Sequence, residues 1–103
     1  NTDLAAARAA ADRGDLAAAV ALCDRHLAAH PPSADAFALL GGVHAAAGRS
    51  LDAERAFTRA LYLDPAHYDA LVHLMALAAG RGDATAAANY RRRAAAAHRA
   101  GEP

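Results

Sequence analysis

The chain of 103 residues has no Lys, Ile, Gln or Trp, a single Cys and only five aromatic side chains. One cysteine leaves no disulfide framework within the chain, which suits a reducing compartment, so we expect a cytoplasmic location. No apolar run approaches the ~20 residues that a helix needs to span a membrane, and we expect no membrane partner. Because large side chains are few, any core has to be built mainly from small residues.

Alanine is the most abundant residue, with 35 copies, and all 11 basic residues are Arg. Ala has the highest helix propensity, so the composition favours helices. The net charge is zero, but residues 1–70 carry a net charge of −3 and residues 71–103 one of +3. The run Arg91-Arg92-Arg93 does not indicate nucleic-acid binding, because successive helical residues point ~100° apart and no aromatic residues alternate with them.

Several residue types recur along the chain at a fixed interval of 34 residues, which is the spacing of Gly14 and Gly48. The recurrences are Gly14, Gly48 and Gly82; Ala19, Ala53 and Ala87; Pro31 and Pro65; Asp35 and Asp69; and Leu40 and Leu74. Between them, apolar residues follow helical spacing and predict helices over residues 3–13, 16–30, 34–47, 51–63, 66–80 and 84–100. Asp15, Ser50 and Asp83 each follow a Gly by one or two residues and are predicted to cap the next helix. Ser33 and Asp64 are the predicted caps of the helices that begin each new repeat.

The segment 37–65 resembles the tetratricopeptide (TPR) pattern W-x2-L-G-x2-Y, A-x3-F, P, whose repeat is about 34 residues long. Phe37 occupies the position of the Trp and His44 that of the Tyr. The other pattern positions are matched by Leu40-Gly41, Ala53-x3-Phe57 and Pro65. The resemblance implies an all-α fold of three TPR helix-turn-helix repeats, six antiparallel helices stacked as a right-handed superhelical solenoid. It also implies a single domain over residues 1–103, with repeats near 1–32, 33–66 and 67–100. Gly41 and Ala53 match small positions at which TPR helices cross closely.

The first and third repeats depart from the pattern. Asp3, Ala6 and Ala10 stand where the pattern has Trp, Leu and Tyr, so the first helix is expected to be weakly anchored. In the third repeat Arg91 replaces the expected aromatic residue. A polar residue there suits the last helix of a solenoid, because no further repeat covers it.

Cys23, His26 and His30 lie at i, i+3 and i+7 on one predicted helix face, a spacing that could supply three zinc ligands. In the repeat register, however, Cys23 takes the position of Phe57 and His26 that of Ala60, which are interior packing positions. His30 falls at a helix end, where a cation suits the helix dipole. We therefore expect no metal site and no cofactor.

The sequence contains no motif that indicates a catalytic site. Gly41-Gly42 lies inside a predicted helix and lacks the strand that precedes a phosphate-binding loop. The histidines have no partnered nucleophile, and the carboxylates fall mostly at predicted caps. We expect this segment to be non-catalytic and to bind protein, as TPR arrays do.

In TPR proteins the first helix of each repeat lines a concave groove. Transferring that register predicts a partner groove of Arg8, Asp12, Asp35, Ala38, Gly42, Ala45, Asp69, Val72, His73 and Ala76, with Leu4, Ala11, Ala46 and Ala79 beside them. The basic clamp with which chaperone-binding TPRs hold a carboxylate is not matched, because two Asp accompany Arg8 and His73. Small residues with acids at one rim favour an apolar or amphipathic helix with basic flanks. The same small residues would also be needed if their only role were close helix packing.

One stretch is more specific than the general TPR pattern: Ala60-Leu61-Tyr62-Leu63-Asp64-Pro65-x-His67-Tyr68-x-Ala70-Leu71-x-His73-Leu74, followed by Gly82-Asp83 and the Arg-rich helix. It resembles the C-terminal TPR appendage of bacterial chemotaxis-type methyltransferases of Wsp-like surface-sensing pathways. Those enzymes use S-adenosylmethionine to methylate receptor glutamates, through a catalytic domain that precedes the TPR. The resemblance implies a regulatory or docking appendage.

Two functions stay open from the sequence. The first is this docking appendage, and the second is an independent TPR adaptor or scaffold in envelope assembly or secretion. The sequence begins at Asn1 without an initiating Met, so we expect a longer natural protein, and its upstream sequence would separate the two. In either case we expect a monomer or weak self-association.

Overall fold

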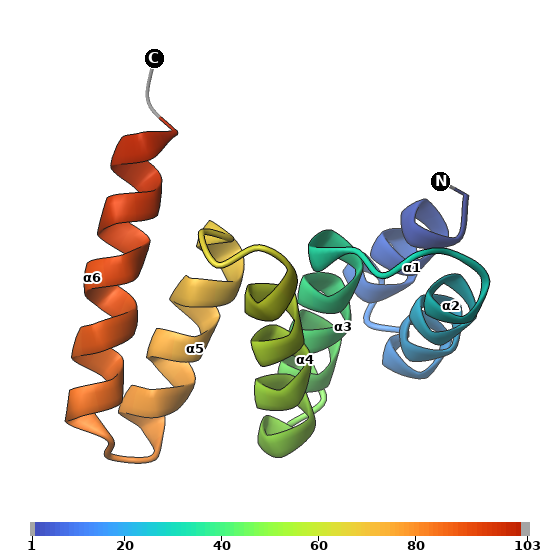
Figure 1. The fold of residues 1–103 in the computed structure, drawn as a ribbon. Helices are drawn as coiled ribbons and strands as arrows, with labels where there is room; N and C mark the ends of the chain where they lie inside the picture. The colour runs from blue at the N-terminus through green and yellow to red at the C-terminus, as the bar shows by residue number, and fades with distance from the viewer. Residues whose placement is uncertain (1, 102–103) are drawn as a thin grey trace.

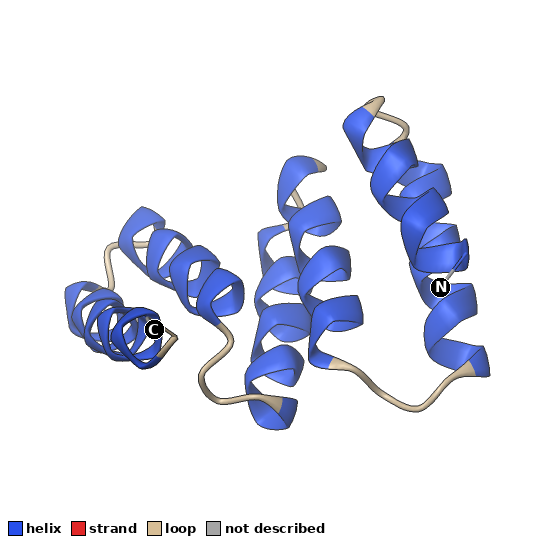
Figure 2. Ribbon diagram, turned by 90° about the horizontal axis from the view of Figure 1, so that it is seen from above, coloured by secondary structure: helices blue, strands red, loops and turns tan. Residues whose placement is uncertain are grey.

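The computed structural model describes residues 2–101, and every regular element in that range is an α-helix. The helices are α1 (Thr2–Asp12), α2 (Leu16–Ala29), α3 (Ala34–Ala46), α4 (Ser50–Leu63), α5 (Tyr68–Gly80) and α6 (Ala84–Ala100). They form the hairpins α1–α2, α3–α4 and α5–α6, which stand side by side in chain order (Figure 1 and Figure 2). This arrangement agrees with the predicted all-α solenoid of three helical repeats. Within the described range no helix is both long and apolar enough to cross a membrane.

The turn inside each hairpin has the same backbone conformation, and a glycine permits it. Gly14, Gly48 and Gly82 have φ angles of 80°, 77° and 80°, in the left-handed region that favours glycine. The residue after each glycine donates its N–H to a carbonyl five residues earlier. These bonds are Asp15 to Ala10, Arg49 to His44 and Asp83 to Ala78, each 2.9 Å long. The recurrence of glycine at the same position of each repeat therefore reflects a repeated helix stop.

Three of the predicted caps are confirmed. Asp15, Ser33 and Asp83 each accept a hydrogen bond from the backbone N–H three residues later. The prediction for Ser50 is wrong, because Arg49 occupies the cap position without a side-chain hydrogen bond and Ser50 already lies inside α4. The middle hairpin has Arg where the outer two have Asp, so this helix start has no side-chain acceptor.

The predicted cap at Asp64 is also wrong. Its carboxylate accepts from the N–H of Ala66 at 3.1 Å and so closes a local turn around Pro65. The cap of α5 is His67, whose side chain accepts from the N–H of Ala70. The helix consequently begins at Tyr68, two residues later than predicted.

The largest buried side chains lie where α3, α4 and α5 meet. Phe57 and Leu71 are fully buried, and Leu74 is 1% exposed. A Cβ added at Gly41 would lie 2.8 Å from carbons of the Phe57 ring. Glycine is therefore required at this crossing, because any larger residue displaces a buried ring.

The first hairpin buries mainly small side chains. Its fully buried apolar residues are Ala7, Ala10, Ala19 and Cys23. In place of an aromatic ring, Asp3 on α1 accepts two hydrogen bonds from Arg25 on α2, at 3.2 Å from Nε and 2.8 Å from Nη2. The hydrogen bond from Arg25 is the main reason that the pKa of Asp3 falls below its ordinary value. A charged pair thus joins the two helices where the TPR pattern has Trp.

The contact between Gly41 and Phe57 can be tested with a matched pair of substitutions. A Cβ at Gly42 meets nothing within 4 Å, so Gly42→Ala gains helix propensity without a clash. Gly41→Ala gains the same propensity but overpacks the core. We expect Gly41→Ala to be less stable than Gly42→Ala by about 1–3 kcal/mol in urea unfolding. Equal stabilities would show that the ring does not rest against Gly41.

The pair between Asp3 and Arg25 predicts a pH dependence. Because the folded pKa of Asp3 is lowered, its contribution is present above the ordinary Asp pKa of about 3.9. It is lost as the pH falls through the lowered value. We expect the difference in urea midpoint between wild type and Asp3→Asn to be largest at neutral pH and to shrink in acid. A difference that does not change with pH would contradict this account.

Candidate functional site

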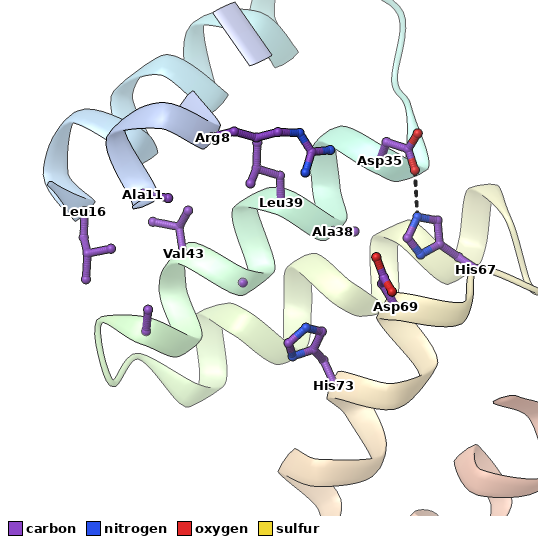
Figure 3. A pocket seen from close by; sticks show the side chains of 12 residues that line it. Arg8, Ala11, Leu16, Asp35, Ala38, Leu39, Val43, His67, Asp69 and His73 are labelled. Atoms are coloured by element: carbon purple, nitrogen blue, oxygen red, sulfur yellow. Dashed lines mark hydrogen bonds and ion pairs between the residues drawn. The ribbon is translucent and has the colours of Figure 1, made fainter. Parts of the chain in front are cut away.

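A hollow of about 230 Å³ lies on the face formed by the first helix of each hairpin. Figure 3 shows α3 as its floor, with α1 on one side and α5 on the other. We call it the α1–α3–α5 hollow. The residues that line it are Arg8, Ala11, Leu16, Asp35, Ala38, Leu39, Gly42, Val43, Ala46, His67, Asp69 and His73.

The hollow is open because α3 carries small residues along one face. Ala38, Gly42 and Ala46 follow one another at intervals of four residues, which places them on one stripe of the helix. The backbone of Gly42 has no heavy atom within 4 Å of an added Cβ, so the space above it is unfilled. Larger residues at these three positions would fill the hollow from below.

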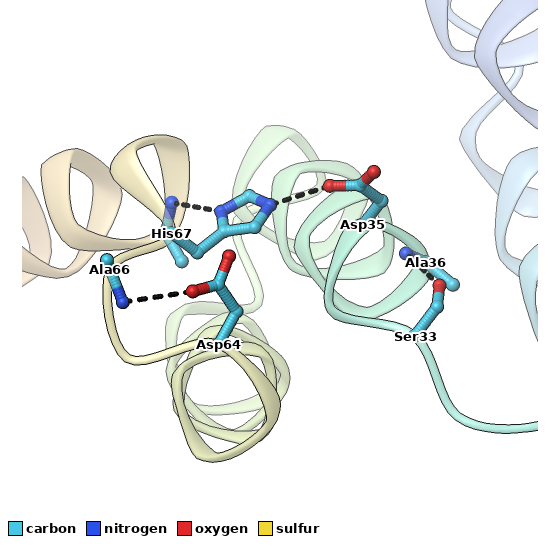
Figure 4. A network of polar contacts seen from close by, with 7 residues as sticks. Ser33, Asp35, Ala36, Asp64, Ala66 and His67 are labelled. Atoms are coloured by element: carbon cyan, nitrogen blue, oxygen red, sulfur yellow. Dashed lines mark hydrogen bonds and ion pairs between the residues drawn. The ribbon is translucent and has the colours of Figure 1, made fainter. Parts of the chain in front are cut away.

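His67 connects α5 to the first turn of α3. Its Nδ1 accepts from the N–H of Ala70 at 3.2 Å, and its Nε2 lies 2.8 Å from Oδ1 of Asp35 (Figure 4). An accepting Nδ1 carries no proton, so the ring proton is on Nε2 and is donated to Asp35. One imidazole therefore caps α5 and fixes Asp35 at the rim of the hollow.

The rim carries charge from all three first helices. Asp35 lies in the first turn of α3 and Asp69 in the first turn of α5, while Arg8 comes from α1. Among the described residues neither Arg8 nor Asp69 forms an ion pair. The α1 side of the hollow is thus basic, and the side where α3 and α5 begin is acidic.

His73 links the hollow to the core. Its ring stacks on the buried ring of Phe57, with centroids 4.8 Å apart and planes inclined by 6°. The face of the molecule that lines the hollow therefore rests directly on the largest buried side chain.

The structure brings together six of the ten predicted groove residues. Arg8, Asp35, Ala38, Gly42, Asp69 and His73 line the hollow, as do the flanking Ala11 and Ala46. The other four predicted residues lie elsewhere. Ala45 and Val72 are half-buried against the core, Asp12 is exposed outside the hollow, and Ala76 lines a separate depression with Leu77 and Arg81. Of the flanking residues, Leu4 and Ala79 do not line the hollow.

Leu16, Leu39, Val43 and His67 line the hollow although they were not predicted to do so. His67 had a signal in the sequence, because it occupies the same position of its repeat as Ser33, the cap of α3. Leu39 and Val43 belong to α3, which forms the floor of the hollow, and Ala11 of α1 lines the wall beside Arg8.

The three residues considered as zinc ligands belong to the first hairpin. Cys23 and His26 are buried, and the ring of His30 stacks on that of His26 at 4.3 Å. Burial raises the pKa of the Cys23 thiol, which disfavours the thiolate that metal binding needs. Over residues 2–101, no three His, Cys, Asp or Glu side chains are arranged to hold a metal ion.

Comparison with known proteins gives two similar sequences, while no family model matches the chain. The probable biofilm formation methyltransferase WspC of Pseudomonas aeruginosa is 46% identical over 85 residues, which is 82% of this chain and 20% of that protein. The protein of the same name from Pseudomonas putida is 42% identical over 80 residues, 78% of this chain and 19% of that protein. The chain spans about a fifth of the length of these relatives, and it is similar to one region of proteins named as methyltransferases.

The double role of His67 can be separated by substitution. His67→Ala removes both the cap and the hydrogen bond to Asp35, and we expect it to lower the free energy of unfolding by about 1–2 kcal/mol. His67→Asn keeps a favourable capping side chain but is too short to take over both contacts. We expect it to recover most of the stability, measured by thermal unfolding. If His67→Asn is as unstable as His67→Ala, the cap is not the main contribution.

Proposed function

We propose that this chain is a TPR-type protein-interaction module that acts as the docking appendage of a chemotaxis-type methyltransferase. The parent enzyme would use S-adenosylmethionine to methylate glutamates of a receptor, and this chain would hold a segment of the receptor or of a signalling partner. The similarity to one fifth of two proteins named as methyltransferases supports the connection to such an enzyme. The regular sequence recurrence and the three hairpins support the TPR assignment.

The observation that carries the docking role is the α1–α3–α5 hollow. Each hairpin contributes its first helix to the same face, and the rim residues Arg8, Asp35 and Asp69 come from three different helices. Residues at equal positions of successive repeats, such as Asp35 and Asp69, thereby lie on one surface. Repeat proteins use such continuous faces to bind extended partner segments.

The chemistry of the hollow supports binding rather than catalysis. Its volume of about 230 Å³ is below the ~300–1,000 Å³ of ordinary small-molecule sites. His67 is occupied by the α5 cap and by Asp35, and among residues 2–101 no hydroxyl or thiol lines the wall beside it. We propose that the methyl donor and the reacting glutamate are bound by the rest of the parent enzyme.

The proposal is tested by deleting residues 1–103 from the parent methyltransferase. We expect the remaining enzyme to fold and to bind S-adenosylmethionine, measured by calorimetry, while methylation of the cognate receptor decreases or loses its regulation. Unchanged methylation after the deletion would contradict the docking role.

A matched pair of point variants locates the binding surface. Ala46 and Ala95 are both exposed helical alanines, but only Ala46 lines the hollow. We expect Ala46→Arg to reduce receptor methylation and receptor pull-down, because it fills the hollow with a charged side chain, whereas Ala95→Arg leaves both unchanged. Thermal unfolding of both variants controls for stability. Equal effects of the two substitutions would remove the hollow from the mechanism.

A further inference from the structure

Building on the proposed docking role, we infer that the bound partner segment presents a basic side chain to Asp35 and Asp69 and an acidic side chain to Arg8. The charges of the hollow thereby set both the chemistry and the direction of the segment. Three observations support this inference. They are the contacts of these three residues, the shape of the floor and a comparison with another acid in the first turn of a helix.

The cation and the carboxylates of the hollow come from different helices. Arg8 extends from α1 over the edge of α3, and Asp69 faces the hollow from the start of α5 (Figure 3). Asp35 lies at the same end as Asp69, and His67 connects it to the start of α5. A segment that crosses the floor of α3 from α1 to α5 therefore passes first a cation and then two carboxylates.

These charges are available to a partner. Within the described part of the chain, Arg8 and Asp69 form no ion pair. Asp35 uses one oxygen for the hydrogen bond from His67, and its side chain remains 76% exposed. The hydrogen bond from His67 involves Oδ1 of Asp35, so the second carboxylate oxygen stays open toward solvent. The acidic side of the hollow can thus attract a cationic side chain.

Acids in the first turn of a helix also have a purely structural role, because they favourably oppose the helix dipole. That role applies equally to Asp52, which lies in the first turn of α4. Asp52 does not line the hollow, and its nearest cation is Arg55 at 4.0 Å. The dipole explains the first-turn acids of α3, α4 and α5, but it does not explain why Asp35 and Asp69 line the same hollow as Arg8. Asp52 is therefore the matched control.

The shape of the floor limits which side chains of the partner segment fit between Arg8 and the two Asp residues. Ala38, Gly42 and Ala46 leave a shallow space of about 230 Å³, enough for small side chains but not for a row of large ones. We infer that the partner segment has small residues between its acidic and basic positions. This occupant is a polypeptide of mixed charge, not a uniformly basic one, since Arg8 would repel the latter.

The test uses the full-length enzyme and overlapping short peptides from the cytoplasmic part of the receptor that it methylates. Binding is measured by fluorescence anisotropy. For a peptide that binds the wild type, we expect replacement of its basic residue by Ala to weaken binding about two- to fivefold, as for a solvent-exposed ion pair. The same replacement should have a smaller effect on the Asp69→Asn variant, in which Asp35 alone remains, and this difference is the signature of a direct coupling. Arg8→Ala should show the same coupling with the acidic residue of the peptide.

The control is Asp52→Asn, which removes a first-turn acid outside the hollow and should bind the peptide like the wild type. If peptides bind but Asp69→Asn and Asp52→Asn behave alike, the inference on charge is wrong while docking stands. If no peptide binds and deletion of residues 1–103 leaves methylation unchanged, both the inference and the proposed function are wrong. Raising the salt concentration should reduce the effect of the Asp69→Asn substitution, because exposed charges are screened.

Discussion

The contact of the Phe57 ring with Gly41 and His73 is the interaction on which the rest of the structure depends. The ring belongs to α4, rests against the backbone of α3 and stacks on an imidazole of α5, so one side chain joins three helices of two hairpins. Because Ala is the main core residue elsewhere, no other contact combines so large a buried ring with so close a backbone approach among the described residues. The second face of this contact belongs to the candidate site, since His73 also lines the hollow. The core and the candidate site are therefore positioned by the same packing.

The fold could be predicted from the sequence because its signals are periodic. Gly14, Gly48 and Gly82 each stop a helix through the same left-handed turn, so their spacing gives the repeat directly. Helix starts were predicted less well, because a cap depends on the placement of a single side chain. Ser50 is one residue too late to cap α4, and the imidazole of His67 replaces Asp64. Nδ1 of an imidazole accepts a hydrogen bond only when the ring proton is on Nε2, and a sequence pattern does not contain that choice of tautomer.

The candidate site was predicted in part, for a geometric reason. Neighbouring residues on a helix point ~100° apart, so an error of one position turns a groove residue toward the core. Ala45 and Val72 are such cases, while Ala46 and His73, one position further, line the hollow. The contribution of Leu39 could not be predicted, because it depends on how α1 packs against α3, which the repeat pattern does not contain. The charged rim was found because Asp35 and Asp69 share the repeat position.

The hairpins differ in how much apolar packing holds them, and the candidate site includes residues from both the better-packed and the less well-packed parts. Asp69 stands on a hairpin that packs large side chains, whereas Arg8 stands on α1, which is held by small residues and by the pair of Asp3 with Arg25. Elements with few apolar contacts open locally at low free-energy cost. A ligand that binds only the closed form stabilises it in proportion to its binding. If the proposed partner segment contacts both Arg8 and Asp69, its binding is expected to stabilise the first hairpin, because it adds a contact where the chain itself supplies little apolar packing.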